Sequence, residues 1–221
     1  MIIACILIFL QDFSNPFYIA QRIGKDEKEF NMIKLRSMII DADKSGVDST
    51  SEDDKRLTFI GRFIRKFKLD EITQLYNVMK GDMSIVGPRP NVKSGVILYT
   101  DIEKNLLKVR PGITDFSSIV FSDEGTILKG SKNPDLDYNQ LIRPWKSRLG
   151  LIYINNQSFF IDICLIVLTV ISIFRRQLAL KYIKKMLVKL NTEENIVAVS
   201  ERNNQLRPYP PPGSDKIYFE H

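Results

Sequence analysis

Residues 56–90, RLTFIGRFIRKFKLDEITQLYNVMKGDMSIVGPRP, carry the features around which the rest of the chain can be arranged. At their centre is a pair of adjacent carboxylates, Asp70 and Glu71. A basic, partly apolar segment precedes this pair, and Arg89 follows it, fixed between Pro88 and Pro90. Acids, cations and a rigid arginine are therefore close in sequence, a pattern that favours a site for a charged ligand.

The segment before the acid pair predicts an amphipathic helix. Its apolar residues recur at steps of three and four positions, namely Leu57, Ile60, Phe63, Ile64 and Phe67. Its basic residues lie off this stripe, namely Arg62, Arg65, Lys66 and Lys68. Two interpretations stay open: a helix in a membrane interface with its cations among anionic headgroups, or a helix that faces the protein core with a solvated basic side.

A second helix is predicted after Lys68, with Gly81 as its stop. Its apolar positions are Leu69, Ile72, Leu75, Tyr76 and Met79. Asp70 falls at the start of this helix, which gives its carboxylate two interpretations. It is either an N-cap, a position that aspartate favours, or a functional group that the helix N-terminus holds ionised.

The neighbours of Asp70 favour the functional interpretation. Glu71 supplies a second hard oxygen donor of the kind that Mg²⁺ accepts, and this ion is typically held by one or two carboxylates plus substrate phosphates. Arg65 and Arg89 could clamp phosphate oxygens, and the flanking prolines leave Arg89 little backbone freedom. Paired acids as metal ligands, together with arginines, predict phosphoryl transfer.

Longer motifs surround the acid pair and give it a context. They are Leu69-Asp70-Glu71, Gln74-Leu75, Asn77-Val78, Lys80-Gly81-Asp82-Met83-Ser84, Val86-Gly87-Pro88-Arg89-Pro90 and Arg110-Pro111-Gly112-Ile113-Thr114. Together they resemble the signature of the bacterial sugar transferases, also called monotopic phosphoglycosyl transferases. The resemblance covers residues 5–175 in round terms.

The resemblance implies a defined reaction and defined roles. A sugar-1-phosphate would pass from a UDP-sugar to undecaprenyl phosphate, with release of UMP and with Mg²⁺ as cofactor. By position, Asp70 would be the nucleophile that forms a covalent aspartyl phosphosugar, and Glu71 would help to manage Mg²⁺ or a proton. Arg89 with Pro88 and Pro90 would contact the nucleotide, and Arg65 would steady the acid pair or the diphosphate.

The resemblance also implies substrate contacts outside residues 56–90. Lys34 and Arg36, with Ser37, resemble the family's K-x-R-S-M element and are expected near the site. Arg110, at the start of the second signature, is expected to contact phosphate. The following residues, Asp115-Phe116-Ser117-Ser118, replace the Gly-Trp-Ala-Gln that often follows, which indicates a subgroup with a different sugar pocket.

Composition narrows the partners of this chain of 221 residues. A net charge of +6 and a pI near 9.2 indicate anionic partners, among which nucleic acid, phospholipid headgroups and nucleotide diphosphates are all eligible. No nucleic-acid-binding motif is recognised, so we expect no nucleic acid partner. The one histidine is His221, which excludes a histidine-based catalytic pair. Cys5 and Cys164 lie in apolar runs and are interpreted as small hydrophobes, not as a disulfide.

The remaining segments predict an α+β fold that is mainly helical. Residues 17–21 and 29–36 predict a β-hairpin around residues 24–27, and residues 41–55 predict a mobile acidic surface loop. Helical patterns follow at 91–109, 149–155, 159–174 and 177–195, and the residues from 201 predict an extended, loosely held tail rich in proline. We expect a partial membrane-associated helix at 1–12, a catalytic domain at 13–176, and a basic helix with its tail at 177–221.

Two apolar runs bear on membrane contact. Residues 1–10 are too short to cross a hydrocarbon core of about 30 Å, whereas the resemblance implies a longer re-entrant helix there, so this helix is expected to be truncated. Residues 159–174 fall just short of a span and contain Asp162, which favours a helix under the fold or at the bilayer surface. The resemblance implies membrane lipids as partners and the bacterial inner membrane as location, with the active site facing the cytoplasm.

Two alternative functions stay open. One is a non-catalytic, N-terminally truncated relative at the membrane surface, which keeps the fold without seating a lipid substrate. The other is a basic nucleic-acid-binding domain, which the net charge permits.

Overall fold

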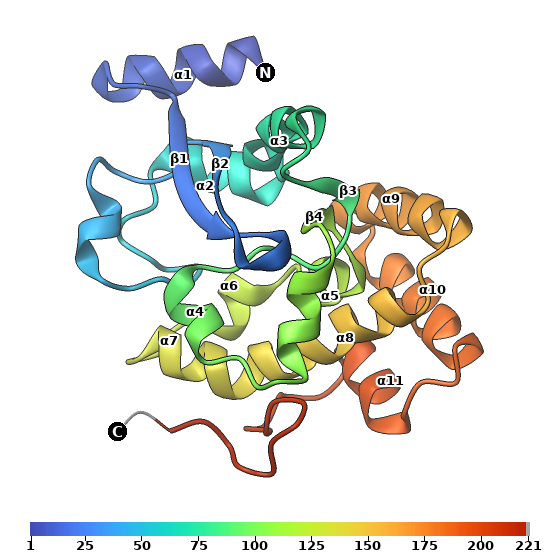
Figure 1. Cartoon of the computed structure of the whole chain (residues 1–221). Helices are drawn as coiled ribbons and strands as arrows, with labels where there is room; N and C mark the ends of the chain where they lie inside the picture. Colours follow the sequence, from blue (N-terminus) through green and yellow to red (C-terminus); the bar gives the residue numbers. More distant parts are fainter. Residues whose placement is uncertain (220–221) are drawn as a thin grey trace.

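The computed structural model describes residues 1–219, so residues 220 and 221, with His221, lie outside it. The fold is α+β and mainly helical, as expected. Figure 1 shows α1 (Ile2–Asp12) and a β-hairpin at one end, a helical body in the middle, and the C-terminal tail along the opposite edge.

The hairpin forms as the sequence predicts. β1 (Phe17–Ile23) and β2 (Glu29–Leu35) pair antiparallel, from Phe17 opposite Leu35 to Ile23 opposite Glu29, and a turn of 3₁₀ helix, η1 (Lys25–Glu27), connects them. The backbone N–H of Ile23 also donates to the carbonyl of Asn91 at 3.0 Å. The end of β1 is therefore fixed against the residue that follows Pro90.

The predicted helix before the acid pair is α2 (Phe59–Lys66), and the side chain of Thr58 caps it by accepting from the N–H of Gly61 at 2.9 Å. Ile64 packs with Ile8 of α1 and Leu35 of β2 in a small buried cluster. Gly61 makes this contact possible, because a Cβ there would lie 1.8 Å from the carbonyl oxygen of Ser37. Only part of the predicted apolar stripe faces the core, since Phe63 is 58% exposed, and Phe59, which lies off that stripe, is 89% exposed.

The second predicted helix is divided into a 3₁₀ helix, η3 (Leu69–Gln74), and α3 (Leu75–Lys80). α3 ends at Gly81 with φ at +88°, as the sequence predicts. Three of its apolar side chains, Leu75, Tyr76 and Met79, are exposed, and Val78 packs against a small buried cluster that contains Met83.

A short parallel pair of strands joins the two signature segments, which sequence periodicity did not predict. β3 (Ser84–Val86) pairs with β4 (Gly112–Thr114), with Ser84 opposite Gly112 and Val86 opposite Thr114. The backbones approach so closely that a Cβ on Gly112 would lie 2.1 Å from the nitrogen of Gly87. The Pro88-Arg89-Pro90 segment is thereby anchored to residues 110–114.

Short helical pieces connect this pair to the helical body. The predicted helical stretch 91–109 is in two parts, α4 (Lys93–Ile97) and the 3₁₀ helix η4 (Glu103–Lys108). After β4 come α5 (Phe116–Val120), α6 (Glu124–Ile127), α7 (Pro134–Asp137) and the π-helix η5 (Tyr138–Ile142). Asp115 caps α5, because its side chain accepts from the N–H of Ser118 at 2.7 Å.

The largest core lies among α5 and the last four helices, α8 (Arg143–Asn155), α9 (Phe159–Phe174), α10 (Arg176–Lys189) and α11 (Glu194–Ser200). The predicted helix at 177–195 is thus two helices, separated near Asn191, whose φ is +52°. Ile183 of α10 and Ile196 of α11 share one core with Phe116 and Leu165. The expected boundary at residue 176 therefore does not separate two cores.

α9 occupies the apolar run 159–174 and packs along one side. Leu165 is buried, Phe159 and Phe174 are exposed, and Asp162 accepts a 2.8 Å hydrogen bond from the hydroxyl of Tyr153. Among residues 1–219, no helix has both the length and the apolar character needed to cross a bilayer. Cys164 of this helix and Cys5 of α1 are both free thiols, as expected.

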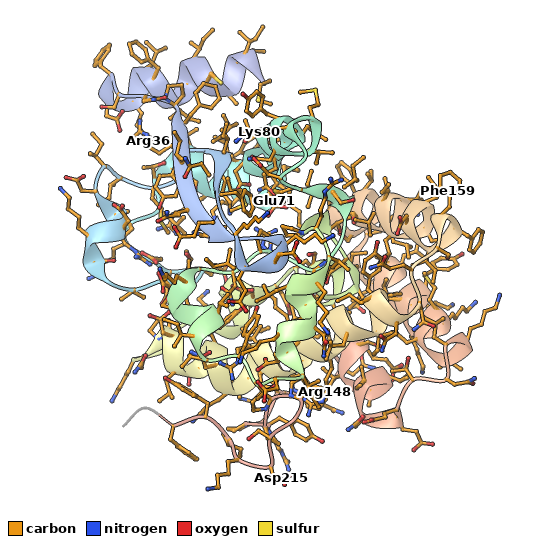
Figure 2. The ribbon with its side chains drawn as sticks, viewed as in Figure 1. Arg36, Glu71, Lys80, Arg148, Phe159 and Asp215 are labelled. Carbon is orange, nitrogen blue, oxygen red and sulfur yellow. The ribbon has the colours of Figure 1, made fainter. Side chains whose placement is uncertain are left out.

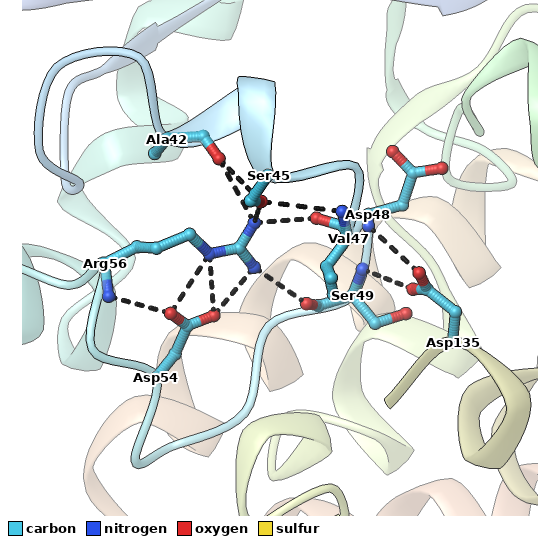
Figure 3. A network of polar contacts seen from close by, with 8 residues as sticks. All are labelled: Ala42, Ser45, Val47, Asp48, Ser49, Asp54, Arg56 and Asp135. Carbon is cyan, nitrogen blue, oxygen red and sulfur yellow. Dashed lines mark hydrogen bonds and ion pairs between the residues drawn. The ribbon is translucent and has the colours of Figure 1, made fainter. Parts of the chain in front are cut away.

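The acidic stretch 41–55 is organised by an arginine, contrary to the mobile loop that we expected. A 3₁₀ turn, η2 (Ala42–Ser45), begins it, and the guanidinium of Arg56 donates to the carbonyls of Ala42, Val47 and Ser49. Figure 3 shows these bonds together with the ion pair between Arg56 and Asp54, at 2.7 Å.

This loop is also bound to the helical body. The carboxylate of Asp135 accepts the backbone N–H groups of Asp48 and Ser49, at 3.2 and 2.7 Å (Figure 3). The N–H of Glu52 donates to the carbonyl of Gly125 at 2.8 Å. The composition of residues 41–55 did not predict this order, because side chains from outside a polar stretch can form hydrogen bonds with its backbone groups.

The proline-rich tail is docked, so the expectation of a loosely held tail is wrong. Tyr209 stacks on Trp145 of α8 with 4.3 Å between ring centroids, and the guanidinium of Arg148 lies over both rings. Arg148 also donates to the carbonyl of Pro210 at 2.9 Å. The tail runs along the edge of the body that lies farthest from α1 (Figure 1), and Arg148 is labelled there in Figure 2.

Candidate active site

Asp70 lies in the first turn of η3 and is 8% exposed. The N-cap interpretation of this residue is wrong, because Lys68 occupies the cap position with φ at +53° and no side chain caps this helix. Within residues 1–219 the Asp70 carboxylate takes part in no hydrogen bond or ion pair. Its oxygens are therefore available to a ligand.

Glu71 is held by Arg89, whose Nη2 donates to Oε1 at 2.5 Å. The two side chains keep 14% and 30% of their surface exposed. Burial alone would raise the pKa of Glu71, but the charges of Arg89, Lys68 and Lys34 outweigh it and lower this pKa to about 2. Glu71 is thus a fixed anion at neutral pH.

The two carboxyls of the pair differ electrostatically. Burial raises the pKa of Asp70, and the neighbouring charge of Glu71 raises it further. The cations Lys34, Arg65 and Arg89 act in the opposite direction without cancelling this rise. The pair therefore combines the permanently ionised carboxylate of Glu71 with Asp70, whose pKa lies above the ordinary range of an aspartate.

Two lysines lie against the pair from different elements. Lys34 comes from β2 and is half-buried, and burial with the nearby charge of Arg89 lowers its pKa to about 8. Lys68 precedes η3 and donates from Nζ to the carbonyl of Ser118 at 3.3 Å. Burial lowers the pKa of Lys68 as well, although the negative charge of Glu71 acts to raise it. With Arg65 and Arg89, these residues make a cationic surround that exceeds the charge of the two carboxylates.

The structure therefore brings Lys34, Arg65, Asp70, Glu71 and Arg89 together, but it places Arg36 elsewhere. Arg36 forms a two-pronged ion pair with Asp12 at the end of α1, at 2.5 and 2.6 Å. Figure 2 shows Arg36 just below α1 and Glu71 well apart from it, between the hairpin and the helical body. Arg36 thus fastens α1 to the hairpin.

The remaining predicted contacts have mixed positions. Pro88 is buried, with its ring near Gly150, and its carbonyl accepts from the N–H of Gly112 at 2.9 Å, so this proline serves the backbone. Pro90 is half-buried and lines a small pocket beside Arg89 together with Ile23, Asn91 and Tyr99. Arg110 has an exposed side chain, and its carbonyl lies against Gly87.

Sequence reasoning missed Arg22. It shares a face of the hairpin with Lys34, because Tyr18 pairs with Lys34 and side chains alternate along β1. Burial lowers the pKa of Arg22, and the charge of Arg89 lowers it further, so the two guanidinium groups are electrostatic neighbours. The strand register was the signal that could have found it.

Mg²⁺ fits this site through hard oxygen donors and not through a complete protein cage. The Asp70 carboxylate and the Glu71 oxygen that does not bind Arg89 are oxygens of the type that the ion prefers. Residues 1–219 hold no cluster of three or more metal-ligating side chains. The remaining ligands would have to be water and substrate phosphate, the usual arrangement for this ion.

A sequence model described as "Bacterial sugar transferase" matches residues 1–176. The chain belongs to the bacterial sugar transferase family. The matched residues include the acid pair, Arg89, the hairpin and α9. The bacterial sugar transferase match ends at residue 176, the first residue of α10, so the rest of α10, α11 and the docked tail lie beyond it.

Several curated relatives resemble this bacterial sugar transferase. Galactosyl transferase CpsE of Streptococcus agalactiae is 33% identical over 76% of the chain, which covers 38% of that relative. A putative undecaprenyl-phosphate N-acetylgalactosaminyl 1-phosphate transferase of Bacillus subtilis is 52% identical over 38% of the chain and 48% of its own length. The UDP-N-acetylgalactosamine-undecaprenyl-phosphate N-acetylgalactosaminephosphotransferase of Aeromonas hydrophila is 30% identical over 78% of the chain and 38% of its length. The chain spans less than half the length of each of these relatives.

Proposed function

We propose that this protein transfers a sugar-1-phosphate from a UDP-sugar to undecaprenyl phosphate. The observation that carries the proposal is the pairing of Asp70, which has no partner within residues 1–219, with Glu71, which Arg89 holds. The names of the Aeromonas and Bacillus relatives, which specify undecaprenyl-phosphate sugar transfer, support the same chemistry.

In the first step, an oxygen of the ionised Asp70 carboxylate attacks the phosphorus that bears the sugar. A bond forms between this oxygen and phosphorus, the bridging P–O bond of the diphosphate breaks, and UMP leaves with the electron pair. The product on the protein is a covalent aspartyl phosphosugar. The cationic surround of Lys34, Arg65 and Arg89 lowers the repulsion between an anionic nucleophile and an anionic donor, which supports this step.

In the second step, a phosphate oxygen of undecaprenyl phosphate attacks the same phosphorus. The bond from phosphorus to the Asp70 oxygen breaks, the carboxylate is restored, and the sugar diphospholipid leaves. Division into two displacements on one side chain means that the nucleotide and the lipid need not be bound together. Ping-pong kinetics follow from this order.

Glu71 and Arg89 orient the site in both steps. Because Glu71 stays anionic, it keeps the Arg89 guanidinium in one position, and the remaining N–H groups of Arg89 would donate to phosphate oxygens. Asp70 and Glu71 would hold Mg²⁺, which supplies charge neutralisation at the diphosphate when it is bound.

The lipid acceptor requires contact with a membrane, and we propose that the exposed apolar side chains provide it. They gather on α1, on the outer side of α2, on α3 and on α9, and they include Ile3, Phe9, Phe59, Phe63, Met79, Phe159 and Phe174. Scattered apolar residues are ordinary on a protein surface, whereas so many large ones on the outer sides of these four helices favour an interaction surface. Arg62 and Lys66 on α2 would meet anionic headgroups. We propose that in a bacterial cell the protein lies on the inner membrane, with its site toward the UDP-sugars of the cytoplasm.

The test is UMP release from UDP-sugars by the full chain in detergent with undecaprenyl phosphate. The substitution Asp70→Asn should lower the rate about a thousandfold or more, because it removes the nucleophile, while chelation of Mg²⁺ should also abolish turnover. Asp101→Asn, on a 97% exposed aspartate that pairs with Lys104 at 3.0 Å, is the matched control and should keep the rate. Undiminished UMP release by Asp70→Asn would refute the proposal, and an inactive unchanged protein would favour a non-catalytic relative.

A further inference from the structure

We propose that Glu124, Lys146 and Tyr138 form the surface that recognises the sugar ring of the donor, through hydrogen bonds to its hydroxyl groups. These residues come from three elements, α6, α8 and η5, and none of them belongs to the acid pair or its cationic surround. The inference rests on the proposed function, because it assigns a part of the same donor.

The three side chains form one connected polar cluster. Lys146 Nζ makes an ion pair and hydrogen bond with Oε2 of Glu124. The same Nζ lies over the ring of Tyr138, 5.4 Å from its centroid. Tyr138 begins the π-helix η5, an irregularity that is frequent at functional sites.

The cluster lies within electrostatic reach of the groups that we assign to the diphosphate. Lys68, just before the acid pair, is bonded to Ser118 of α5, and Glu124 follows six residues later at the start of α6. The charge of Arg89 acts on the pKa of each of the three residues, Glu124, Lys146 and Tyr138. The sugar is bonded directly to the phosphate that Asp70 attacks, so it must lie among groups next to Arg89.

The cluster is charged and only partly enclosed. Burial would raise the pKa of Glu124, but Lys146, Arg89 and Arg65 together lower it, so the carboxylate is ionised at neutral pH. Its side chain keeps 30% of its surface and that of Lys146 keeps 15%. A purely structural ion pair gains nothing from this exposure, whereas a carboxylate that accepts from sugar hydroxyls must have an open edge.

The chemistry suits a pyranose. An ionised carboxylate accepts from adjacent hydroxyl groups, an ammonium donates to a ring or hydroxyl oxygen, and a tyrosine offers both an apolar face and a hydroxyl. A site that hydrogen-bonds a substrate hydroxyl discriminates strongly against sugars that lack it or present it differently, because its own polar groups are then unpaired. The cluster should therefore set the preference among UDP-sugars.

The experiment compares two measurements on the full chain and its variants Glu124→Gln and Tyr138→Phe. The first is kcat/KM for a panel of UDP-hexoses and UDP-N-acetylhexosamines, read as UMP release. The second is the affinity for UMP, which contains the nucleotide but no sugar, measured by calorimetry. We expect the ratio of kcat/KM between the best and the other donors to fall by about tenfold, with the UMP affinity unchanged within about twofold.

Glu52→Gln is the matched control. It removes a carboxylate that pairs with Lys129 at 3.6 Å beside α6, in an exposed position, and it should leave the donor ratio unchanged. An equal fall of kcat/KM for all donors in both cluster variants, or a parallel loss of UMP affinity, would overturn the inference and leave the proposed function standing. Absence of UMP release from every donor by the unchanged protein would instead overturn the proposed function and this inference with it.

Discussion

Arg89 and Glu71 are joined by a 2.5 Å contact between Nη2 and Oε1, although eighteen residues separate them in sequence. The contact exists because the β3–β4 pair anchors the segment that carries Arg89, and η3 directs Glu71 toward it. Arg89 thereby neutralises and orients Glu71, while the carboxylate oxygens of Asp70 are available to a ligand. The division of roles that we propose for the two carboxyls depends on this contact.

Replacing Arg89 by lysine should lower kcat/KM for UMP release by about a hundredfold. A lysine keeps the charge but not the planar fork that binds an anion on two sides, so it cannot hold Glu71 and phosphate together. The free energy of unfolding should fall by about 1–2 kcal/mol, less than for a fully buried pair, because Arg89 keeps 30% of its surface exposed. The measurements are steady-state kinetics and thermal unfolding.

The matched control for Arg89 is Lys93, whose ion pair with Glu29 at 3.1 Å lies nearby and is 74% exposed on the lysine side. Lys93→Met should change neither kcat/KM for UMP release nor the free energy of unfolding. A wild-type rate for Arg89→Lys would show that this arginine does not bind the donor.

The rate of UMP release should fall on the basic side of neutrality with a midpoint near pH 8, the pKa of Lys34. Above this pH the lysine loses the charge that attracts phosphate. Arg stays protonated throughout this range, so Lys34→Arg should move the basic fall to higher pH. On the acid side the fall should lie above the ordinary aspartate range, since the pKa of Asp70 is raised. An unchanged basic midpoint in Lys34→Arg would contradict the assignment.

Lys34 also gives a prediction for stability, which should rise with pH where the rate of UMP release falls. The pKa of Lys34 is about 8 in the folded chain and 10.5 when unfolded, so the unfolded state binds more protons between these values. Stability rises with pH wherever the unfolded state binds more protons. Lys34 should therefore contribute an increase in the free energy of unfolding from pH 8 to pH 10.5, visible as the difference between denaturant titrations of the wild type and Lys34→Met.

Tyr209→Ala should destabilise the protein by about 1–2 kcal/mol, because it removes the stack on Trp145 and one of the two rings under Arg148. For a chain of this size the expected fall in Tm is about 4 °C. Tyr182→Ala is the control, since that ring is 48% exposed and the ammonium of Lys185 lies 5.5 Å from its centroid at the surface. Equal Tm values for both variants would mean that the tail contributes no stability.

Local patterns predicted the elements that local sequence controls. The hairpin followed from two short runs around Gly24, α9 from the mostly apolar run 159–174, and the end of α3 from Gly81. Asp70 and Glu71 could be selected as candidates because adjacent carboxylates in a basic segment are chemically conspicuous. Such features require no knowledge of distant contacts.

The missed features all depend on distant contacts. The β3–β4 pair has three residues in each strand, too few for a periodic signal, and it joins segments more than twenty residues apart. The docked tail depends on Tyr209 meeting Trp145, and the ordered acidic loop depends on Arg56 and Asp135. Arg36 matched a motif and was therefore expected near the site. The position of the Arg36 side chain is instead set by its ion pair with Asp12, which no sequence pattern indicated.

The most direct test of the account is the mass of the protein after it is mixed with its best UDP-sugar, without any lipid acceptor. The account predicts one equivalent of UMP and a protein heavier by one sugar phosphate, with the added mass on the peptide that contains Asp70. Undecaprenyl phosphate should then remove it. An unmodified protein that releases UMP only when the lipid is present, or an equal adduct on the Asp70→Asn variant, would contradict the central claim.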